Sequence, residues 1–149
     1  FLMRTTGLSL DEAERQMCRE SGLKGISGGL NDARDLTEAA DKGNARARLA
    51  LDVLIHHTRH WIGSFFLQLN GADALVFTAG IAENGPALRS AICANLDQLG
   101  VLLDPEINQQ TRAVEAVISR PDSRVKVMVI PTNEELVVAR EVKRFLETN

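Results

Sequence analysis

A glycine-rich turn between two ordered elements is the first feature with chemical potential. Residues 80–86 read Gly-Ile-Ala-Glu-Asn-Gly-Pro and follow a short apolar run over 72–78. Glycine lets a phosphate or a nucleotide approach the backbone closely, and the amides at a helix start are unpaired and partly positive. The alternative is an ordinary strand-to-helix turn, since the segment matches neither the P-loop nor the dinucleotide fingerprint. The candidate nucleotide-binding residues are Gly80, Ile81, Ala82, Glu83 and Asn84.

A second candidate follows the β-branched run over 125–130. Pro131-Thr132-Asn133 ends this run, and Glu134 opens the next helical pattern. In open α/β sheets, ligands sit beyond the carboxyl ends of the strands. Glu134 is therefore a candidate ligand for Mg²⁺, directly or through water. The alternative is an acidic residue that stabilises the first turn of a helix through the helix dipole.

A third candidate lies beside the glycine-rich stretch 22–29. Asp32 can accept a hydrogen bond from a ribose hydroxyl, and the flat cation of Arg34 can stack on a base, with Ala33 between them. The alternative is an exposed helix start that Asp32 or Asn31 caps.

Three histidines invite a metal-site hypothesis that the spacing does not support. His56 and His60 share a helix face, but no Glu completes the catalytic zinc pattern and no third ligand is evident. We interpret them, with His57, as surface or packing residues. No Ser-His-Asp or Cys-His arrangement stands out.

The elements that must position these residues alternate between helices and strands. Apolar periodicity predicts helices over about 10–21, 32–41, 45–69, 86–99 and 134–147, and a weaker one over 105–112. Residues 22–29 are expected to form a loop, and strands are expected at 72–78, 116–119 and 125–130. The helix over 45–69 is the expected core helix, with Trp61, Phe65 and Phe66 in the core. So small a sheet needs further structure beside it.

Composition excludes several classes of protein. The 149 residues are 44% hydrophobic and 25% charged, as expected for one globular domain, with a net charge of −3. That balance argues against nucleic-acid binding, and no apolar run is long enough for a membrane span. Cys18 and Cys93 are too few for a disulfide framework, and we expect a cytoplasmic protein with reduced thiols. The chain opens at Phe1 rather than Met and reads like an internal start.

Three segments in this order resemble the acetate kinase family. They are 31–36 (Asn-Asp-Ala-Arg-Asp-Leu), 76–84 (Val-Phe-Thr-Ala-Gly-Ile-Ala-Glu-Asn) and 129–136 (Val-Ile-Pro-Thr-Asn-Glu-Glu-Leu). The intervening stretches are similar too, so the resemblance covers nearly the whole chain. The family belongs to the superfamily of acetate and sugar kinases, Hsp70 and actin. The resemblance implies a helix-rich α/β fold, a partial ribonuclease H-like (actin-like ATPase) domain with parallel strands near 72–78 and 125–130.

The resemblance also implies an activity. The family transfers the γ-phosphoryl group of ATP to acetate, giving acetyl phosphate and ADP, reversibly and with Mg²⁺. Residues 32–34 would contact ribose and adenine, residues 80–84 would wrap the adenine side and an inner phosphate, and Glu134 would serve the Mg²⁺. Residues 1–149 would form the carboxyl-terminal nucleotide-binding portion of a homodimeric enzyme, with the amino-terminal domain absent.

Two residues depart from the family pattern: Ala82 stands where glycine is usual, and Gly85 where serine is usual. The arginines, histidine and aspartate that align acetate would lie before Phe1. We therefore expect no catalytic residue in this chain and no kinase activity from it alone. The alternatives are part of a propionate or butyrate kinase, or a non-catalytic nucleotide-binding or dimerisation module.

Overall fold

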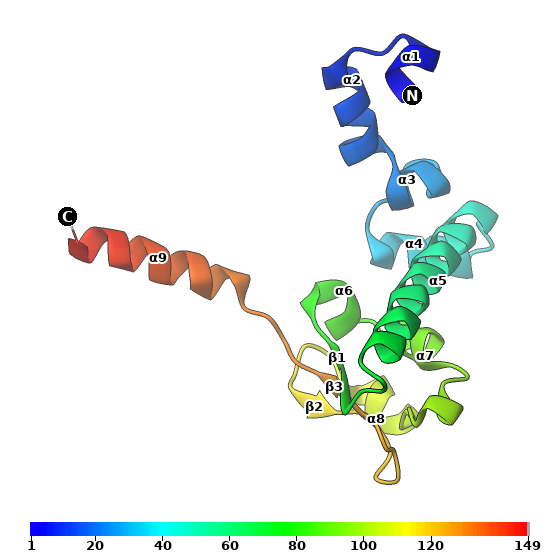
Figure 1. The fold of residues 1–149 in the computed structure, drawn as a ribbon, viewed down its shortest axis with the longest axis vertical. Helices are drawn as coiled ribbons and strands as arrows, with labels where there is room; N and C mark the ends of the chain where they lie inside the picture. Colours follow the sequence, from blue (N-terminus) through cyan, green and yellow to red (C-terminus); the bar gives the residue numbers. More distant parts are fainter. Residues whose placement is uncertain (149) are drawn as a thin grey trace. The chain divides into compact units, whose positions relative to one another are not determined.

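The computed structural model describes residues 1–148, with all their side chains except those of Glu134 and Thr148. The chain divides into two compact units, Phe1–Gly63 and Ser64–Asn149, and each is described by itself (Figure 1). Within the described residues, no helix combines the length and the apolar character that a membrane crossing requires.

The first unit is helical. In chain order its elements are α1 (Leu2–Thr6), α2 (Leu10–Arg15), the π-helical turn η1 (Gln16–Glu20), α3 (Gly22–Ser27), α4 (Ala33–Asp41) and α5 (Ala45–Gln68), which continues into the second unit. The loop expected over 22–29 is wrong, because most of it is α3. Gly28, at φ 84°, ends that helix in the left-handed conformation. A glycine that looks like a loop residue in sequence is here a helix cap.

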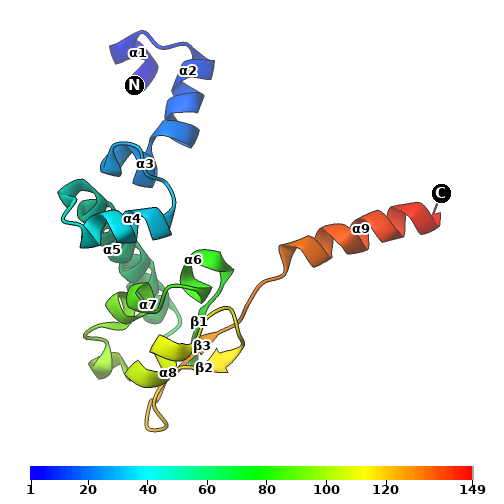
Figure 2. The ribbon, with the colours of Figure 1, turned by 180° about the vertical axis from the view of Figure 1, so that it is seen from behind.

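The core of the first unit lies between α4 and the first turns of α5, which pack against each other (Figure 2). Its buried side chains are Leu36, Ala40, Ala47, Ala50 and Leu51. Farther along α5, Trp61 is 56% exposed and Phe65 is 53% exposed. The expectation that these two aromatic residues are core is wrong. Periodicity identifies the apolar face of a helix, but not how much of that face is covered.

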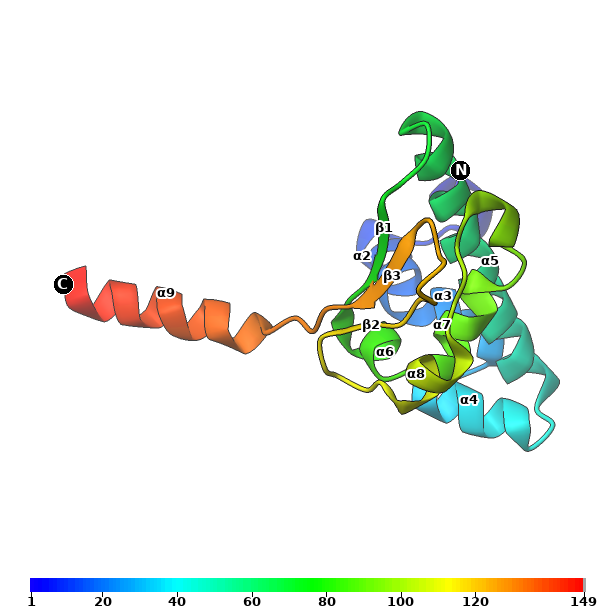
Figure 3. The ribbon, with the colours of Figure 1, turned by 90° about the horizontal axis from the view of Figure 1, so that it is seen from below.

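The second unit contains a small mixed sheet. Its elements are β1 (Ala74–Phe77), α6 (Ala79–Glu83), α7 (Pro86–Cys93), the 3₁₀ turn η2 (Asp97–Leu99), α8 (Pro105–Gln110), β2 (Ala116–Val117), β3 (Lys126–Val129) and α9 (Glu134–Thr148). The strand order is β1-β3-β2 (Figure 3). β1 is parallel to β3, with Phe77 opposite Val129, and β2 is antiparallel to β3. The predicted parallel strands are confirmed.

Two predicted elements of the second unit differ from the structure. The helix expected over 86–99 ends at Cys93, because Asn95 turns the chain at φ 56° before η2. The segment 80–84, expected as an open turn, is largely the short helix α6. Buried apolar residues hold the sheet and its helices together: Phe77, Ile92, Cys93, Val101, Ile118, Val125, Val127 and Val129.

Candidate nucleotide-binding site

The carboxyl ends of β1 and β3 bring two predicted site segments to one end of the sheet. Because the strands are parallel and in register, the chain leaves both at the same end, after Phe77 and after Val129. Ile130 N still donates to the Phe77 carbonyl at 3.0 Å. The predicted nucleotide segment follows β1, and the segment leading to Glu134 follows β3. This is the end of a sheet at which α/β proteins bind ligands.

The turn from β1 into α6 depends on an unusual backbone conformation. Ala79 has a φ of 64°, in the left-handed region that residues with a Cβ seldom adopt. The strain costs about 1–2 kcal/mol. It redirects the chain sharply from the strand into α6, so Gly80 and Ile81 stand exposed at the end of the sheet.

The side chain of Glu83 joins the two segments. Its carboxylate oxygen Oε1 accepts from the Thr132 backbone N at 2.8 Å and from the Thr132 hydroxyl at 3.2 Å. Glu83 is 6% exposed. Sequence reasoning predicted Glu83 to bind nucleotide, whereas the structure directs its carboxylate to the protein itself.

A buried arginine holds the carboxyl end of α6 in place. Arg89 of α7 is fully buried, and its five N–H groups have five acceptors. Nη1 donates to the carbonyls of Ala82 at 2.6 Å and Glu83 at 2.9 Å. Nε donates to Asn108 Oδ1, and Nη2 donates to the carbonyls of Asn108 and Thr111. All five acceptors are neutral, and burial lowers the pKa of Arg89. No residue pattern around Arg89 predicts this role.

Asn108 completes this buried polar cluster. Its Nδ2 donates to the Pro86 carbonyl at 3.0 Å and to the Ser90 hydroxyl at 2.9 Å. A second donor, the Ala113 amide, reaches the Glu83 carbonyl at 3.1 Å. Among the described residues, every buried side-chain nitrogen or oxygen has a hydrogen-bond partner. A buried network in which every polar side-chain atom is hydrogen-bonded therefore holds the carboxyl end of α6 to α7 and α8.

The two glycines of the candidate segment have different surroundings. A Cβ added at Gly80 would meet no atom within 4 Å. A Cβ added at Gly85 would lie 2.5 Å from the Ile81 carbonyl oxygen, so glycine here allows the end of α6 to close on α7. Asn84 Nδ2 donates to the Gly80 carbonyl at 3.0 Å. The space beside Gly80 is therefore open, and no contact among the described residues requires glycine at this position.

The segment that leads to the predicted metal ligand begins α9. Asn133 Oδ1 accepts from the Leu136 amide at 2.9 Å, so Asn133 caps the helix that opens at Glu134. The Glu134 side chain lies outside the described residues. Within the described part of the chain, no three His, Cys, Asp or Glu side chains gather as a metal site.

The remaining predicted site residues belong to the first unit. Asp32 caps α4 by accepting from the Arg34 amide at 2.8 Å, and its carboxylate also binds the Arg34 side chain, Nε to Oδ1 at 3.2 Å and Nη2 to Oδ2 at 3.0 Å. These bonds lower the pKa of Asp32 to about 2. The Arg34 side chain is 89% exposed, so its planar face is open for stacking. Ala33 is the first residue of the helix.

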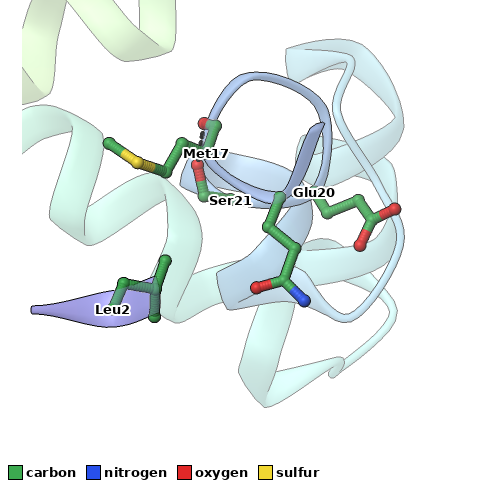
Figure 4. A pocket seen from close by; sticks show the side chains of 5 residues that line it. Leu2, Met17, Glu20 and Ser21 are labelled. Carbon is green, nitrogen blue, oxygen red and sulfur yellow. Dashed lines mark hydrogen bonds between the residues drawn. The ribbon is translucent and has the colours of Figure 1, made fainter. Parts of the chain in front are cut away.

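A separate hollow in the first unit includes none of the predicted site residues. It measures about 300 Å³ and is lined by Leu2, Gln16, Met17, Glu20 and Ser21 (Figure 4). The Ser21 hydroxyl donates to the Met17 carbonyl, so this polar group is already paired.

Comparison with known proteins decides the family. The family model of the acetokinase family matches residues 1–140. The chain belongs to the acetokinase family. The acetate kinase of Methanosarcina thermophila is 49% identical to it over 148 residues, which are 99% of this chain and 36% of that protein. The chain thus spans about a third of the length of the curated relatives it matches.

Solved structures confirm the fold of this acetokinase-family chain. The crystal structure of Porphyromonas gingivalis acetate kinase matches with a TM-score of 0.87 and 34% identity, over 98% of this chain and 37% of that one. A propionate kinase from Francisella tularensis matches with a TM-score of 0.80 and 36% identity, over 94% of this chain and 35% of that one. The predicted helix-rich α/β class, part of an actin-like ATPase domain, is confirmed.

In this acetokinase-family chain, the candidate site is partly assembled. The structure brings residues 80–84 and 131–133 together at one end of the sheet and links them through Glu83. Residues 32–34 belong to the other unit, so their predicted convergence on the same nucleotide stays a prediction.

Proposed function

We propose that this chain is the nucleotide-binding part of a kinase that transfers the γ-phosphoryl group of ATP to acetate. The products are acetyl phosphate and ADP, and the reaction is reversible. The proposal is carried by the pairing of the 80–84 segment with the 131–133 segment at the carboxyl end of two parallel strands. That placement, in a chain of the acetokinase family, supports nucleotide binding at this end of the sheet.

Each predicted segment has a role in this proposal. Residues 80–84 wrap the adenine side and an inner phosphate, and the open space at Gly80 supports a close approach. In the first unit, Asp32 orients the Arg34 guanidinium so that its exposed face can stack on the base. The ribose hydroxyls bind the remaining acceptor sites of the Asp32 carboxylate.

Mg²⁺ is the metal that this chemistry implies, and Glu134 is the residue that would hold it. The Thr132 hydroxyl donates to Glu83 and the Asn133 side-chain oxygen caps α9, so both neighbouring oxygens already have a structural partner. Mg²⁺ takes one or two protein carboxylates and fills its other positions with water and phosphate oxygens. A single carboxylate at this point fits that donor set. When bound, the cation neutralises charge on the nucleotide phosphates.

The acyl substrate is the finer part of the proposal. The propionate kinase of Francisella tularensis is 36% identical to this chain, so propionate is the second candidate substrate. We propose that the groups selecting the carboxylate and the catalytic groups belong to the rest of an enzyme of this family. The chain itself then supplies nucleotide and metal contacts. A homodimer in the cytoplasm is the proposed setting, and the exposed apolar side chains of α5, such as Trp61 and Leu67, support a partner surface.

Calorimetric titration of the chain with Mg-ADP tests the nucleotide assignment. We expect measurable binding of Mg-ADP. Gly80→Val and Asp32→Ala should each weaken this binding by about tenfold or more, which is roughly the effect of one lost charged hydrogen bond. The first variant places a side chain in space that the fold leaves open. The second removes the group that orients Arg34.

Gly63→Val is the matched control for Gly80→Val. Gly63 is also a helical glycine whose added Cβ would meet no atom within 4 Å, and it lies outside the proposed site. This variant should bind Mg-ADP as the unmodified chain does. Absence of binding by the unmodified chain, or an affinity that neither site variant lowers, would refute the assignment.

A further inference from the structure

Glu83 occupies a position that its role as a nucleotide contact does not explain. Its carboxylate faces the protein, is nearly fully buried, and takes two hydrogen bonds from Thr132, 49 residues away along the chain. Thr132 belongs to the segment that begins α9. A buried carboxylate costs free energy unless it is well hydrogen-bonded, and an apolar side chain would fill the space more cheaply. The arrangement therefore calls for a reason beyond filling the interior.

We propose that Glu83 is a positioning residue that couples the nucleotide segment to the metal-binding end of α9. This inference rests on the proposed function, because it concerns the same site. Glu83 fixes Thr132, and Thr132 stands two residues before Glu134. The carboxylate thereby sets where Glu134 stands relative to residues 80–84, so that nucleotide and Mg²⁺ bind more tightly together than apart.

The contacts of Glu83 make it a rigid connection. At its backbone, the carbonyl accepts from Arg89 Nη1 at 2.9 Å and from the Ala113 amide at 3.1 Å. At its other end, the carboxylate holds both the amide and the hydroxyl of Thr132. A charged acceptor strengthens these bonds relative to neutral ones.

The connection continues directly into α9. Next to Thr132, Asn133 accepts from the Leu136 amide at 2.9 Å and so caps the first turn of the helix. The connection from the Glu83 carboxylate to this cap contains no flexible linker, because Thr132 and Asn133 are adjacent and both are hydrogen-bonded. A shift of the Glu83 carboxylate therefore displaces the start of α9.

Three variants separate positioning from stability. Glu83→Ala removes the acceptor, whereas Glu83→Gln keeps an oxygen that can accept both Thr132 bonds. Asp104→Ala is the control, because Asp104 caps α8 through the Glu106 and Ile107 amides. Its loss lowers stability, while the Glu83 carboxylate and both of its Thr132 donors are kept. For each chain, amide exchange at Thr132 is followed by NMR without nucleotide. ADP affinity is then measured with and without Mg²⁺.

The proposal predicts faster Thr132 amide exchange in Glu83→Ala, and near-normal exchange in Glu83→Gln and Asp104→Ala. It also predicts that the gain in ADP affinity produced by Mg²⁺ falls by about fivefold or more in Glu83→Ala, and returns to within about twofold in Glu83→Gln. Unchanged Thr132 exchange in Glu83→Ala would overturn it. So would an equal loss of affinity with and without Mg²⁺, which is what a purely structural role produces. If the unmodified chain binds no ADP, the proposed function fails. The exchange data still decide whether the Glu83 carboxylate holds Thr132.

Discussion

Arg89 and Asn108 are joined twice inside the second unit. The Arg89 Nε donates to the Asn108 side-chain oxygen at 2.8 Å, and Nη2 donates to the Asn108 backbone carbonyl at 2.9 Å. The remaining donors of Arg89 reach α6 and Thr111. One buried cation thus ties the candidate nucleotide segment to α7 and α8 without any carboxylate. Such a group is costly to disturb, since each freed acceptor stays buried.

Arg89→Lys should destabilise the chain strongly. Lysine has three donors where arginine has five, so two buried acceptors lose their partners, at a cost of about 1–3 kcal/mol each. We expect the free energy of unfolding in urea to fall by roughly 2–6 kcal/mol. Arg112→Lys is the control, because Arg112 is exposed in the same region, and it should change stability by less than about 0.5 kcal/mol. Equal stability in the two variants would contradict the role given to Arg89.

Asp32 should titrate far below an ordinary aspartate. The Arg34 side chain, and then the Arg34 amide, lower the pKa of Asp32 to about 2. A lowered carboxylate pKa means that the stabilisation is fully present above the unfolded value of about 3.9 and is lost as pH falls through about 2. Carboxyl-carbon NMR should show this pKa, and Arg34→Ala should raise it toward the ordinary value. Asp32→Asn keeps a capping oxygen and should remove this pH dependence. A wild-type pKa near 3.9 would refute the pairing.

Ala79→Gly should stabilise the chain. Ala79 holds a φ of 64°, which glycine adopts without the steric cost of about 1–2 kcal/mol. After the greater flexibility of glycine in the unfolded chain is subtracted, we expect a net gain of up to about 1 kcal/mol in thermal or urea unfolding. Ala82→Gly is the matched control, since Ala82 lies in α6 without a positive φ, and it should lose about 0.5–1 kcal/mol. Destabilisation by both changes would show that Ala79 is not strained.

Local signals explain which features the sequence predicts well. Ser9 and Glu12 have capping-box spacing and form one, Asp32 caps α4, and Pro86 opens α7 at the first helical position. Each depends on residues within one turn of each other, so spacing alone reveals it. The parallel pairing of β1 with β3 agrees with two short apolar runs of the kind that parallel strands show.

Non-local contacts explain what the sequence could not predict. The acceptors of Arg89 are mostly backbone carbonyls, which every residue carries, and three of the five lie 19 to 22 positions away. No residue pattern marks such a cluster. Likewise, nothing near Glu83 indicates that its carboxylate reaches Thr132 rather than a ligand. Trp61 is a related case. The sequence shows the apolar face of α5 on which it lies, but not which residues pack against that face, and Trp61 is exposed.

The chain alone should form no acetyl phosphate. Phosphoryl transfer requires cations placed around the equatorial oxygens of the moving group. Arg89, the arginine nearest in sequence to residues 80–84, has all five donors bound within the fold, so it has none for a phosphoryl group. With ATP, Mg²⁺ and acetate, a hydroxamate assay should give the background rate, while the acetate kinase of Methanosarcina thermophila serves as the positive control. Turnover comparable to that enzyme would contradict the prediction, since this chain would then itself contain groups that stabilise the transferring phosphoryl group.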